Sequence, residues 1–209
     1  MAEKGYPAGL VDAFMLGCEP CMAARGFRRS GRFFRRRDAE VVLTVWVQLF
    51  SFNRVAGDGD PVDFRVQLSA YPKAIDEFLG RPVEKSPRVG GWYPQAELPG
   101  MGRFRHFVIA PNNHPLDEVV SIAISQLEQE GAQFFEECRS LDAIAAGWRI
   151  GAEGSIPTVE RLALDIVRGV PTIWWDEYEK WKASNGPTRP SVVEHIDAEL
   201  DRLDLTPPS

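Results

Sequence analysis

Two stretches of alternating apolar and polar residues, 41–52 and 62–71, constrain the fold of this chain more than any other feature. Both are rich in β-branched and aromatic residues, which favour strands. The connection between them contains Gly57-Asp58-Gly59, a composition typical of a hairpin loop. The sequence therefore predicts two antiparallel strands whose successive side chains point to opposite faces of a sheet.

The alternation gives these strands one apolar face and one polar face. The apolar face is predicted to be core, and it consists of Val41, Leu43, Val45, Val47, Leu49, Val62, Phe64, Val66 and Leu68. The polar face is a candidate surface for a ligand or a partner, although a covering helix explains it equally well. Its residues are Thr44, Trp46, Gln48, Arg65, Gln67 and Ser69, with Val42 and Phe50 beside Trp46.

The remaining patterns predict helices and one further strand. Residues 8–25 carry apolar side chains at helical spacing and should form an amphipathic helix that ends near Gly26 and bends at Pro20. The further strand is expected over 103–111. Additional helical segments are expected over 73–79, 116–127, 141–146, 159–167, 172–183 and 192–203.

Together these elements predict an α+β fold: an antiparallel sheet of about four strands with an N-terminal helix and several C-terminal helices. We expect a core domain over 1–150 and a helical extension over 151–209 that packs on the same domain. With 209 residues, 44% of them hydrophobic, the chain can bury a sizeable core. Residues 80–102 are rich in proline and glycine and predict a long irregular loop, in which Trp92 and Tyr93 are a candidate binding pair.

Seven arginines and no acidic residue lie between Arg25 and Arg37, whereas the whole chain has a net charge of −6. Closely spaced guanidiniums can neutralise phosphates, and neighbouring phenylalanines could stack on bases. The acidic remainder would repel a long polyanion, so an acidic protein partner is favoured over nucleic acid. The arginines could also be structural, as partners of acids elsewhere or as part of a hairpin that leads into the sheet. The candidate binding residues in this cluster are Arg28, Arg29, Arg35 and Arg36.

The cysteines, the histidines and the remaining motifs predict no specific redox, metal or catalytic site. Cys18 and Cys21 have the spacing of a thioredoxin-like pair, but they lie late in a helical pattern, whereas a reactive thiol needs a helix N-terminus. Cys138 and the three histidines are too scattered to predict a zinc site. No nucleophile signature or phosphate loop occurs, so we assign no cofactor, no metal and no catalytic residue.

The predicted helix over 172–183 carries a stripe of aromatic residues. Trp174, Tyr178 and Trp181 share one face of a predicted helix, which is typical of core packing and would be a partner site only if exposed.

The N-terminus lacks the features of a secretion signal, and no apolar run approaches the roughly 18 residues of a membrane span. Three cysteines, an odd number, suit a reducing compartment. We therefore expect a cytoplasmic protein.

The order of these segments resembles a bacterial family catalogued as domain of unknown function 4304. In that family an N-terminal helix ends in a Gly-Phe pair, matched here by Gly26-Phe27. A strand carrying a glutamine follows, matched by Gln48, and a second strand ends in a Tyr-Pro turn, matched by Tyr71-Pro72. Residues 131–148 are similar to the family's closing helical segment. The resemblance covers roughly residues 8–150 and implies an α+β fold with an antiparallel sheet, and it carries no assigned activity.

Three functional hypotheses follow from the sequence. The first is a non-enzymatic binding or interaction protein, such as an immunity-like or regulatory partner of another protein. The second is a small-molecule-binding protein or enzyme that uses the polar sheet face at Trp46, Gln48 and Arg65 together with the 80–102 loop. The third is nucleic-acid binding through the Arg25 to Arg37 cluster.

Overall fold

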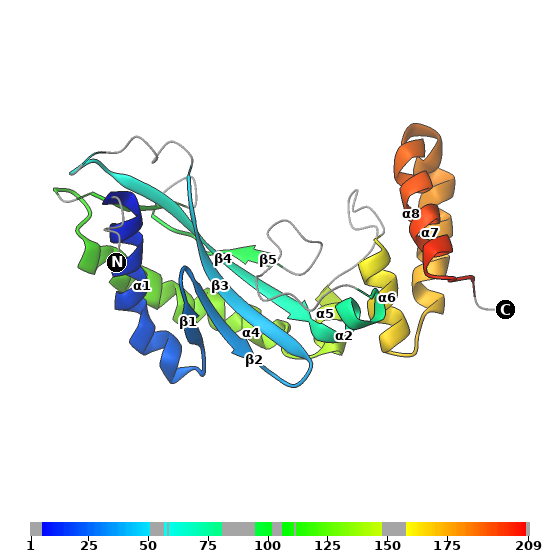
Figure 1. Ribbon diagram of the computed structural model, residues 1–209, viewed down its shortest axis with the longest axis horizontal. Helices are drawn as coiled ribbons and strands as arrows, with labels where there is room; N and C mark the ends of the chain where they lie inside the picture. Colours follow the sequence, from blue (N-terminus) through cyan, green and yellow to red (C-terminus); the bar gives the residue numbers. More distant parts are fainter. Residues whose placement is uncertain are drawn as a thin grey trace. The chain divides into compact units, whose positions relative to one another are not determined.

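The computed structural model describes residues 6–50, 57, 59–80, 95–101, 106–110, 112–147 and 158–207. The chain divides into two compact units, each built from two separate parts of the sequence. The first unit comprises Met1–Tyr71 and Gln95–Glu136, and the second comprises Pro72–Pro94 and Glu137–Ser209. Most elements of the two units are labelled in Figure 1.

The first helix, α1 (Tyr6–Ala24), ends in a Schellman motif. The Phe27 amide donates to the carbonyl of Met22, and the Gly26 amide donates to the carbonyl of Ala23. Gly26 has a φ of +79°, a conformation that glycine adopts without steric cost. Because Phe27 and Met22 are both buried, the chain leaves the helix in a defined direction, toward the first strand.

Six strands of the described part of the chain form one sheet in the first unit. The strands β1 to β5 lie in sequence order, and β6 also pairs with β4. A two-residue loop joins β1 to β2, and Gly31 at its first position has a φ of +60°, as in a type II′ turn. The strands are β1 (Arg28–Ser30), β2 (Phe33–Arg37), β3 (Val41–Leu49), β4 (Val62–Pro72), β5 (Gln95–Glu97) and β6 (Phe107–Ile109).

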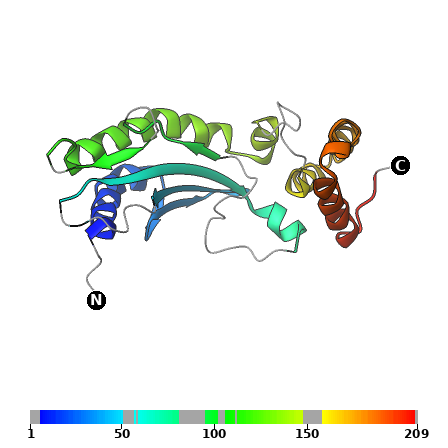
Figure 2. The same cartoon turned by 90° about the horizontal axis from the view of Figure 1, so that it is seen from above.

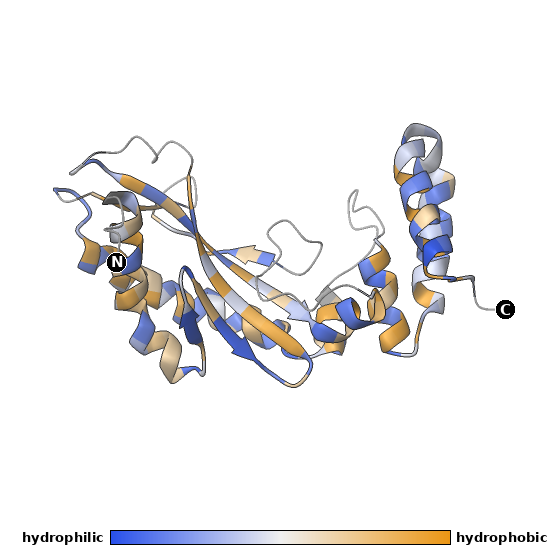
Figure 3. Cartoon of the chain, viewed as in Figure 1, coloured by the Kyte–Doolittle hydropathy of each residue, from blue (hydrophilic) through white to orange (hydrophobic). Residues whose placement is uncertain are grey.

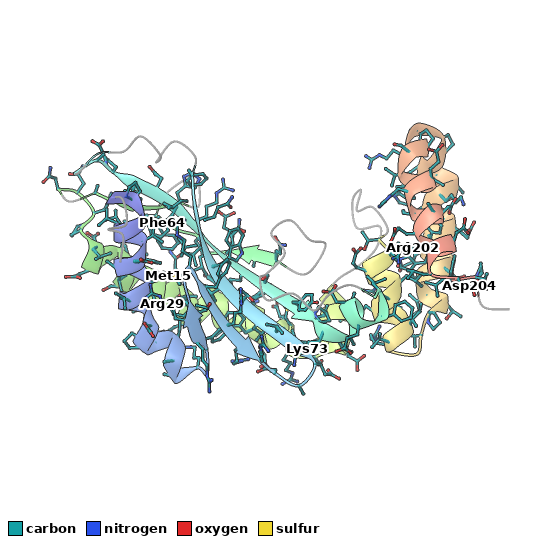
Figure 4. All side chains as sticks on the ribbon, viewed as in Figure 1. Met15, Arg29, Phe64, Lys73, Arg202 and Asp204 are labelled. Atoms are coloured by element: carbon teal, nitrogen blue, oxygen red, sulfur yellow. The ribbon has the colours of Figure 1, made fainter. Side chains whose placement is uncertain are left out.

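Helices cover one face of this sheet. The helix α3 (Leu116–Gln126), the π-helical turn η2 (Leu127–Gly131) and α4 (Ala132–Glu137) follow one another along that face (Figure 2). Phe14 of α1 meets Phe64 of β4 edge to face, with 4.7 Å between ring centroids, and Phe64 stacks on Phe107 of β6 at 5.7 Å. Met15 and Phe64, which are labelled in Figure 4, are both buried here. The predicted apolar face is therefore the core.

The second unit is helical in its described part, with α6 (Val159–Val167) at its centre. α6 contacts α2, α5, α7 and α8. The Thr158 hydroxyl caps α6 by accepting from the Arg161 amide, and the Thr158 carbonyl accepts from Nε1 of Trp174 at 3.0 Å. The other elements are α2 (Lys73–Phe78), α5 (Leu141–Gly147), α7 (Thr172–Asn185), η3 (Gly186–Thr188) and α8 (Pro190–Arg202).

The predicted α+β class is confirmed, with an N-terminal helix, an antiparallel sheet and several C-terminal helices. The sheet has six strands in the described residues, more than the four or so expected. β1 and β2 come from the arginine-rich segment and are largely hydrophilic beside β3 (Figure 3), which obscures their alternation. β5 has only three residues and lies within the segment expected to be irregular. Among the described helices, none has the length and apolar character that crossing a membrane requires.

Candidate binding face of the sheet

The register of β1, β2 and β3 sends alternate residues of the arginine-rich segment to opposite faces of the sheet. Phe34 is paired with the core residue Val45, so it and Arg36 point to the helix-covered face. Their neighbours along β2 point to the other face. On that other face the paired residues are Phe33 with Trp46, Arg35 with Thr44, Arg37 with Val42 and Arg28 with Arg35.

Three arginines on the helix-covered side are bound within the fold. Arg29, labelled in Figure 4, lies between β1 and α1, where its side chain is 18% exposed. Arg36 lies over the ring of Phe27 and also donates to the carbonyl of Arg25. The ion pairs are Arg29 Nη2 to Asp12 Oδ1 (3.2 Å), Arg29 Nη1 to Glu19 Oε2 (3.7 Å), Arg25 Nη2 to Glu128 Oε1 (3.2 Å) and Arg36 Nη2 to Asp38 Oδ2 (3.0 Å).

Three other arginines gather at one end of the opposite face, and we name this group the cationic end: Arg28, Arg35 and Arg37. Arg28 and Arg37 are exposed, and Arg35 is half-buried. Burial, together with the nearby charge of Arg37, lowers the pKa of the Arg35 guanidinium. The strand register thus brings like charges together on one patch.

An aromatic and amide row continues from the cationic end across β3. Arg35 lies over the ring of Phe33 at 5.0 Å, and Phe33 stacks on Trp46 with 6.4 Å between centroids. Farther along the face, the Gln67 amide donates to Oε1 of Gln48 at 3.3 Å. Trp46 is only 7% exposed, so its ring is packed within the fold and holds this row in a fixed position on the sheet.

Arg65 is the centre of a second group on the same face. Its guanidinium lies over the ring of Phe50 at 4.9 Å, and its Nη2 is 3.3 Å from Nε2 of His106. Because arginine only donates, this contact is a hydrogen bond in the tautomer whose Nε2 accepts. Arg65 Nε is 3.1 Å from Glu97 Oε1, yet neither atom has a hydrogen bond of acceptable geometry. Two buried polar atoms of this group, Arg65 Nε and Glu97 Oε1, are thus left without hydrogen bonds.

Strand pairing explains why residues distant in sequence meet at Arg65. β5 and β6 occupy successive parts of the same edge of β4, because Gln67 pairs with Glu97 and Phe64 pairs with Phe107. Arg65 lies between these two positions. At the far end of this face, burial raises the pKa of Asp63, and the charge of His106 opposes the shift.

We name the whole surface the polar-aromatic face, defined by the following residues: Arg28, Phe33, Arg35, Arg37, Thr44, Trp46, Gln48, Phe50, Arg65, Gln67, Glu97 and His106. The structure brings together the predicted candidates Arg28, Arg35, Trp46, Gln48 and Arg65 on it. The candidates Arg29 and Arg36 lie on the opposite side of the sheet. Trp92 and Tyr93 lie outside the described residues. Sequence reasoning did not assign Phe33, Glu97 or His106 to this surface, and only the pairing of β2, β5 and β6 reveals them.

The cysteine pair on α1 lacks the environment of a redox site. Burial, together with the neighbouring Cys21, raises the pKa of Cys18 to about 12. Burial also raises the pKa of Cys21, although Arg25 opposes this shift and donates to its Sγ at 3.0 Å. Among the described residues, no three His, Cys, Asp or Glu side chains form a group that could hold a metal ion.

The second unit contains a buried charged cluster of its own. Arg161 is 6% exposed, and its Nη2 is 3.2 Å from Oδ1 of Asp165, which is fully buried. Arg161 also donates to the carbonyl of Ala145 at 2.8 Å, and Arg168 pairs with Asp165 at 3.1 Å. These contacts join α5 to α6 and satisfy the buried charges, as a structural network does. The aromatic stripe of α7 is also buried, which confirms the core-packing interpretation of Trp174, Tyr178 and Trp181.

Comparison of the chain with protein-family models, with curated proteins and with solved structures gave no match.

Proposed function

We propose that this chain is a non-enzymatic interaction protein that binds a protein partner on the polar-aromatic face of its first unit. The observation that carries the proposal is the strand register, which places Arg28, Arg35 and Arg37 on the face opposite the helices. Phe33, Trp46 and Arg65 lie on that same face. Aromatic side chains and arginine are the residues most enriched where protein partners meet.

The chemistry of this face favours binding over catalysis. Its one histidine, His106, has Nε2 engaged by Arg65, so that nitrogen is not poised to take a proton from a nucleophile. Arg65 and Glu97 are already paired with each other at 3.1 Å, which leaves no free carboxylate there to act as a general base. Recognition through charge, stacking and hydrogen bonds is what this set of groups supports.

The relationship to the family known as domain of unknown function 4304 is also a proposal. Its support is positional, because Gly26-Phe27 ends α1, Gln48 lies in β3 and Tyr71-Pro72 ends β4.

Site-specific photo-crosslinking in the native host tests the proposed function. A photoreactive phenylalanine analogue is placed at Arg37 or Gln67 on the polar-aromatic face, or at Ser121 or Gln129 on the helix-covered side. The last two positions are exposed and serve as matched controls. We expect the same protein adduct from both positions on the polar-aromatic face and from neither control, because only that face contacts the partner.

Thermal melting of each labelled protein shows that the analogue is tolerated. Adducts at the helix-side positions alone, or none at any position in folded protein, would contradict the proposed function.

A further inference from the structure

Two of the groups that contact Arg65 on the polar-aromatic face come from a single stretch of chain. Glu97, whose Oε1 lies 3.1 Å from Arg65 Nε, is the last residue of β5. His106, whose Nε2 lies 3.3 Å from Arg65 Nη2, comes directly before β6. The placement of both groups therefore depends on how the connection between β5 and β6 is held.

Gln126, the last residue of α3, holds this connection at Gly100 from the helix-covered side of the sheet. Its Oε1 accepts from the Gly100 amide at 2.9 Å, and its Nε2 donates to the Gly100 carbonyl at 2.9 Å. A side-chain amide carries the same kinds of donor and acceptor as a peptide group. Gln126 therefore satisfies both backbone polar groups of Gly100, as a neighbouring strand would.

Backbone hydrogen bonds link Gly100 to the strands on both sides of it. Toward β5, Leu98 is fully buried, and its amide donates to the carbonyl of Val66 at 3.0 Å. Toward β6, the Met101 amide donates to the carbonyl of His106 at 2.6 Å. Because Gly100 lies between these two hydrogen bonds, a shift of its backbone is passed to β5 on one side and to His106 on the other.

We infer that Gln126 is a positioning residue, which sets the geometry of Arg65, Glu97 and His106 on the polar-aromatic face from the opposite side of the sheet. The inference rests on the proposed function, because that face is the proposed binding surface. The helix itself changes geometry at this position, since the π-helical turn η2 begins at Leu127, directly after Gln126. Single π-helical turns within α-helices occur frequently at functional sites.

Proton NMR of the histidine rings in the full-length chain tests the positioning. The rings of His106 and Phe50 have centroids 4.3 Å apart, so the carbon-bound proton signals of His106 report where its imidazole lies. These signals should move in Gln126→Met, which removes both hydrogen bonds and has a similar helix propensity. They should also move in Gln126→Glu, which has no donor for the Gly100 carbonyl. The exposed His195 of the second unit is the internal reference.

Gly17→Ala is the matched control for a loss of stability alone. A Cβ at Gly17 would lie 2.8 Å from Cγ2 of Val120 on α3, so the variant strains the contact between α1 and α3 without removing either hydrogen bond of Gln126. Urea denaturation gives the free energy of unfolding of each variant. Signals of His106 that stay unchanged in Gln126→Met, or that move equally in Gly17→Ala, would overturn the inference.

Photo-crosslinking from position 67 separates the inference from the proposed function on which it rests. In Gln126→Met the adduct yield should fall roughly threefold or more, about the factor that one ordinary hydrogen bond contributes, whereas Gly17→Ala should keep the wild-type yield. If the wild type gives no adduct while the His106 signals move only in the Gln126 variants, the proposed function is wrong and the positioning role stands. If the wild type gives the adduct and the signals do not move, the proposed function stands and the positioning role is wrong.

Discussion

Neighbouring arginines of this chain have opposite roles because strand geometry alternates their directions. Arg36 is bound to Asp38 and lies over Phe27, whereas Arg35 lies over Phe33 on the other side of the sheet. Substitution of Arg36 therefore removes contacts that hold the first unit together. Substitution within the cationic end removes charge from a surface.

The thiols supply a test at the residue scale. Because burial raises the pKa of both Cys18 and Cys138 to about 12, only about one molecule in ten thousand carries either thiolate at a pH near 8. We expect both thiols to resist iodoacetamide in the native protein at that pH and to react once the chain is denatured. Mass spectrometry of the labelled peptides measures this directly. Rapid native labelling of Cys18, or a native disulfide between Cys18 and Cys21, would contradict the structural role of these residues.

Local alternation predicts part of the polar-aromatic face. Trp46, Gln48 and Arg65 were assigned to one surface because residues two apart on a strand share a face. His106 and Glu97 could not be assigned with them, since they reach Arg65 only through the pairing of β5 and β6 with β4. Such pairings depend on contacts far apart in sequence, which alternation does not encode.

At the scale of elements, α1 and α3 approach closely where α1 has a glycine. A Cβ built on Gly17 would lie 2.8 Å from Cγ2 of Val120 and 2.9 Å from its Cγ1, closer than real contacts allow. Because valine is branched at Cβ and stiff, its methyl groups cannot move aside without cost. Gly17 therefore permits the contact between the two helices.

Alanine at position 17 tests this contact. Gly17→Ala would ordinarily stabilise a helix interior by roughly 1 kcal/mol. Here the overlap with Val120 should make the substitution destabilising, so that the free energy of unfolding falls. The double variant Gly17→Ala with Val120→Ala should recover the loss, because the second substitution removes the clashing methyl groups. Urea denaturation of the two single variants and the double variant measures the coupling. Simple additivity of the two single effects would show that the helices do not meet at this point.

Long periodic elements were predicted from the sequence, and short ones were not. The expected helix over 159–167 coincides with α6, and the strand over 62–71 differs from β4 by one residue. The three-residue strands β1 and β5 were missed because so few residues show no period, and their pairing partners determine their structure. Proline and glycine around β5 also favoured the expectation of an irregular loop.

At the scale of the whole molecule, each unit has its own buried interior. The first is built on the sheet and α1, and the second on α6 with Arg161 and Trp174. Every residue of the polar-aromatic face belongs to the first unit. For this reason charge changes in the second unit are suitable controls for binding, since they alter the net charge at residues that are not part of the face.

The net charge of the molecule also shapes the binding behaviour that we expect. A chain with a net charge of −6 does not attract anions over long distances, so the cationic end acts through contact and through its local field. Salt should therefore weaken binding of the proposed partner at this end, because the arginines there are exposed or half-buried. Half-buried Arg35 should be the least affected of the three.

The most direct test of whether the cationic end exists for binding is a paired measurement on Arg28→Glu. This substitution places a carboxylate opposite Arg35 and replaces repulsion with attraction across the strand pair. We expect the free energy of unfolding to rise by roughly a few tenths of a kcal/mol, while the yield of the protein adduct from the photoreactive residue at Gln67 falls. A variant that is less stable than the wild type, or that gives the same adduct yield, would contradict the proposal that the cationic end is part of the partner-binding surface.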